Sequence, residues 1–137
     1  MLTSSNPCPC DSGTTFGQCC GPFLAGTAYP NTALLLMRSR YSAFVTGNSE
    51  YLLQTWAPRT RPQQLSFDPA VQWTGLEIVH TEAGSPFHDT GIVEFVATYS
   101  TLHPSGTQQL GHQHERSKFI RHLGRWVYLD GELDHES

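Results

Sequence analysis

The spacing of hydrophobic residues predicts two helices in the first half of the chain. Between residues 32 and 46, apolar side chains recur every three or four positions, as they do along one face of a helix. Asn31 or Thr32 can cap the start of this helix, and Gly47 is the kind of residue that ends one. A second, shorter helix is expected from Glu50 to about residue 56, before a proline-containing segment.

After residue 62 the pattern changes to an alternation of apolar and polar residues, which is typical of strands. Turns rich in glycine, proline and serine separate the alternating segments, so neighbouring strands are expected to pair antiparallel. The predicted strands are a short one beginning at Leu65, then residues 73–82, 90–102, 110–123 and 126–129. Helices followed by strands predict an α+β fold, with the helices on one face of a curved antiparallel sheet. Such a sheet, wrapped on a long helix, forms a cone with an open mouth.

The composition narrows the class of protein. The chain has 137 residues and an apolar content that suits a globular domain. Its net charge of −4 argues against general nucleic-acid binding, which needs a basic surface. No apolar run approaches the roughly 20 residues of a membrane-spanning helix, and residues 1–6 lack a secretion signal. We therefore expect a cytoplasmic protein without membrane or nucleic-acid partners. The acidic residues 130–136 are expected to form a solvated, frayed end.

All four cysteines lie between residues 8 and 20, in the pattern C-x-C, eight residues, then CC. Thiolates are soft ligands that bind zinc well, and a structural zinc site is closed by four protein ligands in a tetrahedron. Ser12, Gly13 and Gly17 supply turns that would bring the two pairs together. Disulfides, for which three pairings exist, and free thiols are the alternatives. We favour one structural Zn²⁺ site, with the ligands Cys8, Cys10, Cys19 and Cys20.

Residues 7–22 resemble the SEC-C zinc motif, which is named for the C-terminal tail of the SecA preprotein translocase. The shared pattern is C-x-C-x-S-G, five residues, then CC. Asp11 is a departure, because the motif often has glycine there. The resemblance implies a zinc knuckle, residues 1–23, followed by a domain of residues 24–137. Because the translocase tail binds a chaperone partner, the resemblance also implies that the knuckle can dock on another protein.

The whole chain resembles the YchJ-like family, in which a SEC-C knuckle precedes a nuclear transport factor 2-like domain. Ketosteroid isomerases share the fold of that domain. The segments that carry the resemblance are Met37–Phe44, Thr55–Trp56, Trp73–Leu76, His114–Phe119 and Trp126–Gly131. The family has no established reaction, so the resemblance implies the fold and the metal but no substrate. Related cone folds often pair through the sheet, which leaves a homodimer open.

Two polar groups are candidates for a ligand site in the cone. Arg38 and Arg40 lie near Tyr41 on the first helix, with Arg38 on the face of Tyr41 and Arg40 pointing elsewhere, and an arginine here could bind an anionic group at the mouth. The alternative is a solvated or salt-bridged arginine on the helix surface. Glu115 shares a strand face with Ser117 and Phe119, so it is desolvated if that face lines the cone. It would then need a partner such as Arg40 or Tyr41, either in a buried ion pair or as a catalytic acid.

Glu94 and Trp126 complete the set of candidate ligand-binding residues. Glu94 lies between Ile92 and Val96 in the clearest strand segment, so it is either a cavity carboxylate or a cross-strand partner of a basic residue. Trp126 is a large aromatic residue near a strand end, which suits either the core or the wall of a cavity. The basic candidates for the partner of Glu94 are Arg116, Lys118 and Arg121.

These features support two hypotheses about function. The first is a zinc-stabilised binding protein, which docks on another protein through its knuckle or holds a small molecule in the cone. The alternative is a small enzyme that uses Glu94 or Glu115 as acid or base in the cone. The first is favoured because the cysteine motif is specific and no catalytic set of residues is recognisable. Whether the chain is an enzyme stays open.

Overall fold

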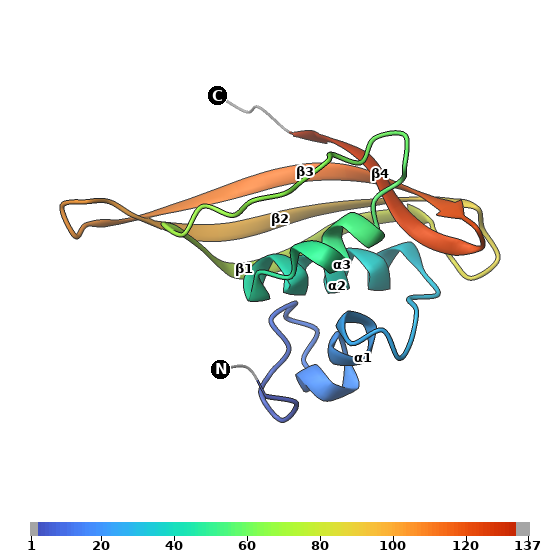
Figure 1. Ribbon diagram of the computed structural model, residues 1–137, viewed down its shortest axis with the longest axis horizontal. Coiled ribbons are helices and arrows are strands. Elements are labelled where there is room, and N and C mark those ends of the chain that lie inside the picture. The colour runs from blue at the N-terminus through green and yellow to red at the C-terminus, as the bar shows by residue number, and fades with distance from the viewer. Residues whose placement is uncertain (1–2, 134–137) are drawn as a thin grey trace.

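Figure 1 shows three layers in the computed structural model of the protein, which describes residues 3–133. A four-stranded sheet is the first layer, and the helices α2 (Ala33–Thr46) and α3 (Ser49–Gln54) lie along one face of it. The N-terminal knuckle lies on the other side of the helices, and it contains the short helices η1 (Phe16–Gln18) and α1 (Gly21–Leu24). The predicted α+β fold is therefore confirmed.

The strands lie in the order β1, β2, β3, β4, and each pairs antiparallel with the next. β2 and β3 pair without interruption, from Thr90 opposite Ile120 to Leu102 opposite Gln108. β1 is irregular, because its pairing shifts after Trp73 and again after Ile78, and such shifts increase the local twist of a strand. The bounds of the four strands are Val71–Ala83, Thr90–Leu102, Gln108–His122 and Arg125–Leu133.

Two parts of the sequence prediction need correction. β4 is longer than the predicted segment 126–129, because its pairing with β3 continues past a shift to Leu133. Asp130 and Glu132 therefore belong to a strand and not to a frayed acidic end, of which residues 134–137 lie outside the described part of the chain. No strand begins at Leu65; this residue and Phe67 pack on a small core cluster formed by residues of α2 and α3.

Helix α2 is enclosed between the sheet and the knuckle. Thr32 caps its start, because the Thr32 Oγ1 atom accepts a hydrogen bond from the Leu35 N–H at 3.1 Å. Gly47 ends it in a left-handed conformation with a φ of 72°. The enclosure buries polar as well as apolar side chains of this helix, and each of them needs a partner inside the protein. The buried polar residues of α2 are Ser39, Arg40 and Ser42.

The knuckle and the sheet share one hydrophobic core. Cys8, Cys10 and Cys20 are buried in the same cluster as apolar side chains of α2 and of all four strands. The predicted knuckle and the predicted cone domain are thus packed together through continuous contacts. Within residues 3–133, no helix is long and apolar enough to cross a membrane. The other buried members of the cluster are Ala33, Leu36, Met37, Tyr41, Leu76, Val93, Phe95, Ala97, Phe119 and Trp126.

Candidate functional site

Four cysteine sulfur atoms meet where the knuckle packs on α2. The Sγ atoms of Cys8, Cys10, Cys19 and Cys20 all lie within 4.8 Å of one another. The Cys10 and Cys19 sulfurs are 3.6 Å apart, and the Cys19 and Cys20 sulfurs are 3.9 Å apart. Four sulfurs bound at about 2.3 Å to a tetrahedral ion are separated by about 3.8 Å. The cluster therefore has the size and the donor set of a four-thiolate metal site.

The local sequence folds the two cysteine pairs together. Asp11 and Gly13 have positive φ values of 61° and 91°, and they turn the chain back after the first pair. The Cys8 N–H then donates to the Thr14 carbonyl at 2.9 Å, as in a small hairpin. The short helices η1 and α1 present the second pair to the first.

Neighbouring groups act on the cysteine sulfurs. The Ser42 Oγ atom of α2 lies 3.6 Å from the Cys8 Sγ atom. A hydroxyl in this position can orient and tune a thiolate ligand of a metal. Hydrogen bonds to the sulfurs of Cys10 and then Cys8 raise the pKa of Cys20. Four thiolates this close together repel one another, so a bound cation would favour the deprotonated cluster.

Two hydrogen bonds tie the loop between the cysteine pairs to the rest of the fold. Asp11 Oδ2 accepts from the Leu76 N–H of β1 at 3.0 Å, next to the first irregularity of that strand. Arg38 Nη1 of α2 donates to the Cys10 carbonyl at 2.7 Å. Asp11 is the residue that departs from the SEC-C pattern, and the sequence alone assigns it no role. In the structure it joins the loop to the sheet.

A second site is a cavity of about 280 Å³ between α2 and the inner face of the sheet. Its apolar wall includes Tyr41 and Phe44 from α2, and Trp73 and Phe95 from the strands. The rings of Tyr41 and Trp73 meet edge-on, with their centroids 6.5 Å apart. Burial raises the pKa of Tyr41 to about 12, so this wall is uncharged at neutral pH. An apolar cavity near 300 Å³ with a few polar groups is the usual form of a small-molecule site.

Arg40 is buried at the polar end of this cavity, with 4% of its surface exposed. Its Nη1 atom donates to the Leu52 carbonyl at 2.8 Å and to Thr55 Oγ1 at 2.7 Å. Its guanidinium lies over the rings of Trp56 and Tyr128, with Cζ 5.1 and 4.7 Å from their centroids. Burial lowers the pKa of Arg40 to about 10, so the side chain is still a cation at neutral pH. The alternative of a solvated arginine on the helix surface is therefore wrong.

Glu115 faces the same cavity from β3. Its carboxylate accepts hydrogen bonds from the Ser117 hydroxyl, from the Gln113 amide at 3.2 Å and from the Tyr128 hydroxyl at 3.5 Å. Burial and then the charge of Glu115 raise the pKa of Tyr128, so the phenol keeps its proton and can donate. Ser117 and Phe119 are buried, as expected if their strand face is the inner one. These three hydrogen-bond donors are neutral, so among the described residues Glu115 has no positive partner within ion-pair distance.

Glu94 lies on the opposite face of the sheet from the cavity. Val93 and Phe95 on β2 are buried against the helices, whereas the Glu94 carboxylate contacts His114 Nε2 at 2.6 Å and Arg116 Nη1 at 3.4 Å. The interpretation of Glu94 as a cavity carboxylate is therefore corrected to that of a cross-strand partner of Arg116. The enzyme hypothesis retains only Glu115 as its acid or base.

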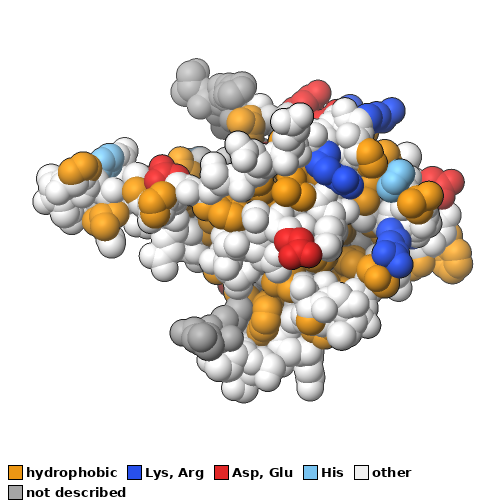
Figure 2. Space-filling model, viewed as in Figure 1, with side chains coloured by type: hydrophobic (Ala, Val, Ile, Leu, Met, Phe, Trp, Pro, Cys, Tyr) orange, Lys and Arg blue, Asp and Glu red, His pale blue; other side chains and the backbone are white. Residues whose placement is uncertain are grey.

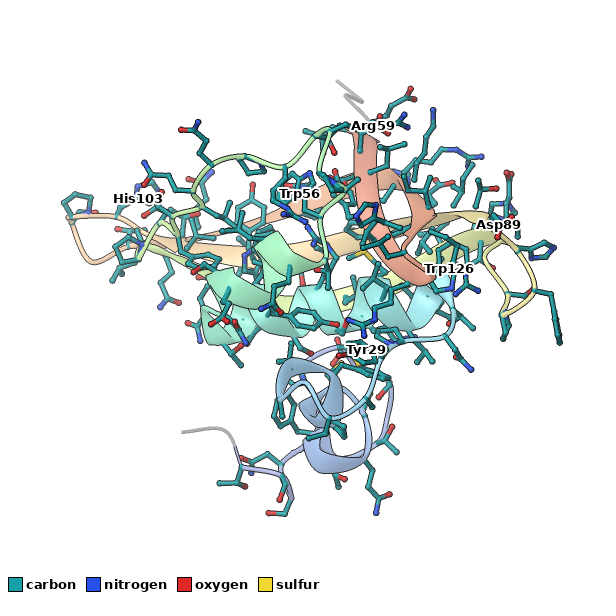
Figure 3. The ribbon with its side chains drawn as sticks, turned by 45° about the vertical axis from the view of Figure 1, so that its right-hand side comes forward. Tyr29, Trp56, Arg59, Asp89, His103 and Trp126 are labelled. Atoms are coloured by element: carbon teal, nitrogen blue, oxygen red, sulfur yellow. The ribbon has the colours of Figure 1, made fainter. Side chains whose placement is uncertain are left out.

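Trp126 is also absent from the lining of this cavity. It is 2% exposed and packs in the core, under the Arg121 guanidinium with Cζ 4.3 Å from the ring centroid. Figure 3 shows Trp126 towards the end of the sheet near Asp89, and Trp56 nearer the middle of the molecule.

The structure thus brings together three of the five candidate ligand-binding residues, Arg40, Tyr41 and Glu115, in one cavity. Sequence reasoning missed Gln113 and Tyr128 at this site. The alternation of β3 places Gln113 on the face of Glu115 and could have identified it. Tyr128 reaches the site because β4 pairs with β3 opposite Phe119, and the sequence carries no signal for that register.

Comparison with known families adds an independent line of evidence. A family model described as "YchJ, middle NTF2-like domain" matches residues 32–131, and the SEC-C motif matches residues 5–22. A relative named "UPF0225 protein", from Streptomyces coelicolor, is 53% identical over 127 residues. The alignment covers 93% of this chain and 95% of that relative.

Two solved structures resemble the whole chain. The solution structure of a SEC-C motif containing protein from Rhodopseudomonas palustris has a TM-score of 0.74 and 32% identity. It matches over 91% of this chain and 96% of that one. A crystal structure of a SEC-C motif containing protein from Psychrobacter arcticus has a TM-score of 0.73 and 27% identity, and the match covers 100% of this chain and 88% of that one.

Proposed function

The chain belongs to the YchJ family, with a SEC-C motif before an NTF2-like domain, and we propose that it is a zinc-stabilised protein that binds a small molecule in its cone cavity. The observation that carries this proposal is the cavity of about 280 Å³, in which an aromatic wall faces a buried arginine and a carboxylate. A charge in an apolar cavity destabilises a fold unless it is well partnered, so a natural chain that keeps a buried arginine and a half-buried carboxylate there favours a role in binding.

Zinc is the ion that best suits the cysteine cluster. Four thiolates are soft ligands, and closed four-cysteine sites are structural zinc sites in most proteins that have them. A bound ion would hold the knuckle loop against α2, because the sulfur of Cys8 contacts Ser42 of that helix and the carbonyl of Cys10 accepts from Arg38. The ion would have a structural role and stabilise this packing, because four protein ligands leave no coordination position for a substrate.

The proposal of a binding cavity is tested by filling it. Small neutral aromatic probes, added to ¹⁵N-labelled protein, should shift amide signals of residues around the cavity in a saturable way. Ala97 of β2 is buried and lines the cavity, so Ala97→Leu should weaken probe binding about tenfold or more by occupying the space.

Val96→Leu is the matched control, because it adds bulk on the same strand at a residue that does not line the cavity. This variant should bind as the wild type does. Equal binding by Ala97→Leu, or saturable binding by none of the probes at millimolar concentration, would contradict the proposal.

A protein partner is a second candidate, favoured by a groove of about 930 Å³ between the knuckle and the β3–β4 turn. Leu123 at its rim is 90% exposed, and Arg125 stacks on Tyr29 with Cζ 3.6 Å from the ring centroid. Within residues 3–133, Arg125 has no carboxylate within 4.0 Å, which favours a partner segment that carries an acidic side chain beside an apolar one. Figure 2 shows that the Lys and Arg side chains on this face gather at the end of the molecule that carries the turn.

This second candidate is tested by placing a photo-crosslinking residue at position 123 in cells. Leu110, which is 79% exposed at the far end of β3, provides the matched control position. One defined partner with an acidic contact segment should be recovered from position 123 and not from position 110. The same products at both positions would exclude the groove as a docking site.

A further inference from the structure

The cavity holds one positive and one negative group that do not form an ion pair. Arg40 and Glu115 both line it. Within residues 3–133, however, no carboxylate oxygen lies within 4.0 Å of the Arg40 guanidinium. The two charges therefore face a common space without pairing directly with each other.

Both charged groups keep hydrogen-bonding capacity for that space. A guanidinium has five N–H donors, and only Nη1 of Arg40 has acceptors among the described residues. Nε and Nη2 are left to donate to a molecule in the cavity. A carboxylate offers about four acceptor positions, and Glu115 uses three of them. One position is left to accept from the same molecule.

The balance of charge limits what the molecule can be. The remaining lining residues are uncharged, since Tyr41 and Tyr128 keep their protons at neutral pH. A ligand with a net charge would add an unbalanced charge to a space that is largely walled by aromatic rings, which is unfavourable. The volume of about 280 Å³ equals that of about nine waters in the liquid, which suits one or two small rings.

We infer that the cavity binds a neutral ring compound whose polar group both accepts a hydrogen bond from Arg40 and donates one to Glu115. A primary carboxamide has this pair of functions, with its oxygen directed to the guanidinium and its nitrogen to the carboxylate. The inference rests on the proposed function, and it names the chemical class of the ligand.

The test compares four probes of one size at neutral pH: benzamide, benzoate, benzylammonium and toluene. Dissociation constants are measured by titration of the labelled protein. Benzamide should bind about tenfold or more tightly than benzoate and benzylammonium, because each ion leaves one charge of the cavity unmatched. Equal or tighter binding of either ion would overturn the inference.

The Glu115→Gln variant should shift the preference of the cavity from benzamide towards benzoate. This variant leaves Arg40 as the one charged residue that lines the cavity, so benzoate should gain about tenfold relative to benzamide. Glu77→Gln, at an exposed position of β1, is the matched control and should leave the order of the probes unchanged. An unchanged ratio in folded Glu115→Gln protein would also overturn the inference. If that variant does not fold, the order of the four probes on the wild type still decides.

The toluene result distinguishes failure of this inference about the ligand class from failure of the proposed binding function. If toluene binds in the cavity and benzamide binds no better, the polar pair does not select the ligand, and this inference fails while the proposed function stands. If no probe binds, including toluene, both fail.

Discussion

Arg40 places a buried positive charge at the polar end of the cone cavity, which is otherwise largely apolar. One edge of its guanidinium donates to the Leu52 carbonyl and Thr55 Oγ1, and its faces contact the Trp56 and Tyr128 rings. A planar, delocalised cation suits these contacts, whereas a lysine ammonium can reproduce neither the fork nor the stacking.

The stability of the fold should therefore depend on Arg40. In Arg40→Ala the Leu52 carbonyl loses its side-chain donor, and the half-buried Glu115 loses the positive charge that shares its cavity. We expect the free energy of unfolding to fall by about 3 kcal/mol, and by about 1–2 kcal/mol for Arg40→Lys, as measured by urea denaturation. Arg59→Ala, at an exposed site labelled in Figure 3, is the control and should change it by less than about 0.5 kcal/mol. Wild-type stability of Arg40→Ala would show that the contacts of Arg40 are not what holds this region.

At the scale of single residues, the sequence showed which side chains are candidates for the site better than it showed on which face of the sheet each one lies. The alternation of β3 placed Glu115, Ser117 and Phe119 on one face of the strand but left open whether that face lines the cone, and the structure shows that it does. β2 has apolar residues on both faces, with Val93 and Phe95 inward and Ile92 and Val96 half-buried on the other side. Alternation could not decide which set faced the helices, so the side of Glu94 could not be predicted.

At the scale of elements, the SEC-C pattern does not predict the contact between the knuckle loop and β1. Asp11 has a left-handed φ of 61° and accepts from the Leu76 N–H. Asp and Asn tolerate this conformation better than other non-glycine residues, because their short side chains hydrogen-bond locally. The residue at position 11 thus serves both the turn and the docking of the loop.

Substitutions at Asp11 should separate docking from metal binding. Asp11→Ala removes the acceptor and puts alanine in the left-handed region, so the free energy of unfolding should fall by about 1–2 kcal/mol. Asp11→Asn keeps an acceptor and tolerates the φ value, so the fall should be below about 0.5 kcal/mol. Both variants should keep the metal content of the wild type. Equal loss of stability in both, or loss of metal in either, would count against this role of Asp11.

The bounds of most elements followed from local signals. Thr32 and Gly47 fixed the two ends of α2, and the predicted bounds of β2, residues 90–102, are the observed ones. The length of β4 and the irregularities of β1 could not be predicted, because they depend on which residue of the neighbouring strand pairs with which. Those pairings are contacts between distant parts of the chain.

At the scale of the whole molecule, the four clustered cysteines belong to the main core. They pack with Met37 and Tyr41 of α2, and Tyr41 also lines the cone cavity. The sequence predicted the cluster of cysteines from their spacing alone, but it could not show that the knuckle covers α2. That arrangement explains how α2 can bury Arg40 and Ser42, since the helix has protein on both sides. Metal, helix and cavity are therefore expected to be coupled in stability.

The most direct test of this account is thermal unfolding of the reduced protein, with its zinc content measured before and after chelation. The protein should contain one zinc ion per chain and unfold in a single cooperative transition, whose Tm falls by about 10 °C or more on chelation and returns with Zn²⁺ but not with Mg²⁺. Reduced protein that contains no metal and yet unfolds at the same Tm would contradict it.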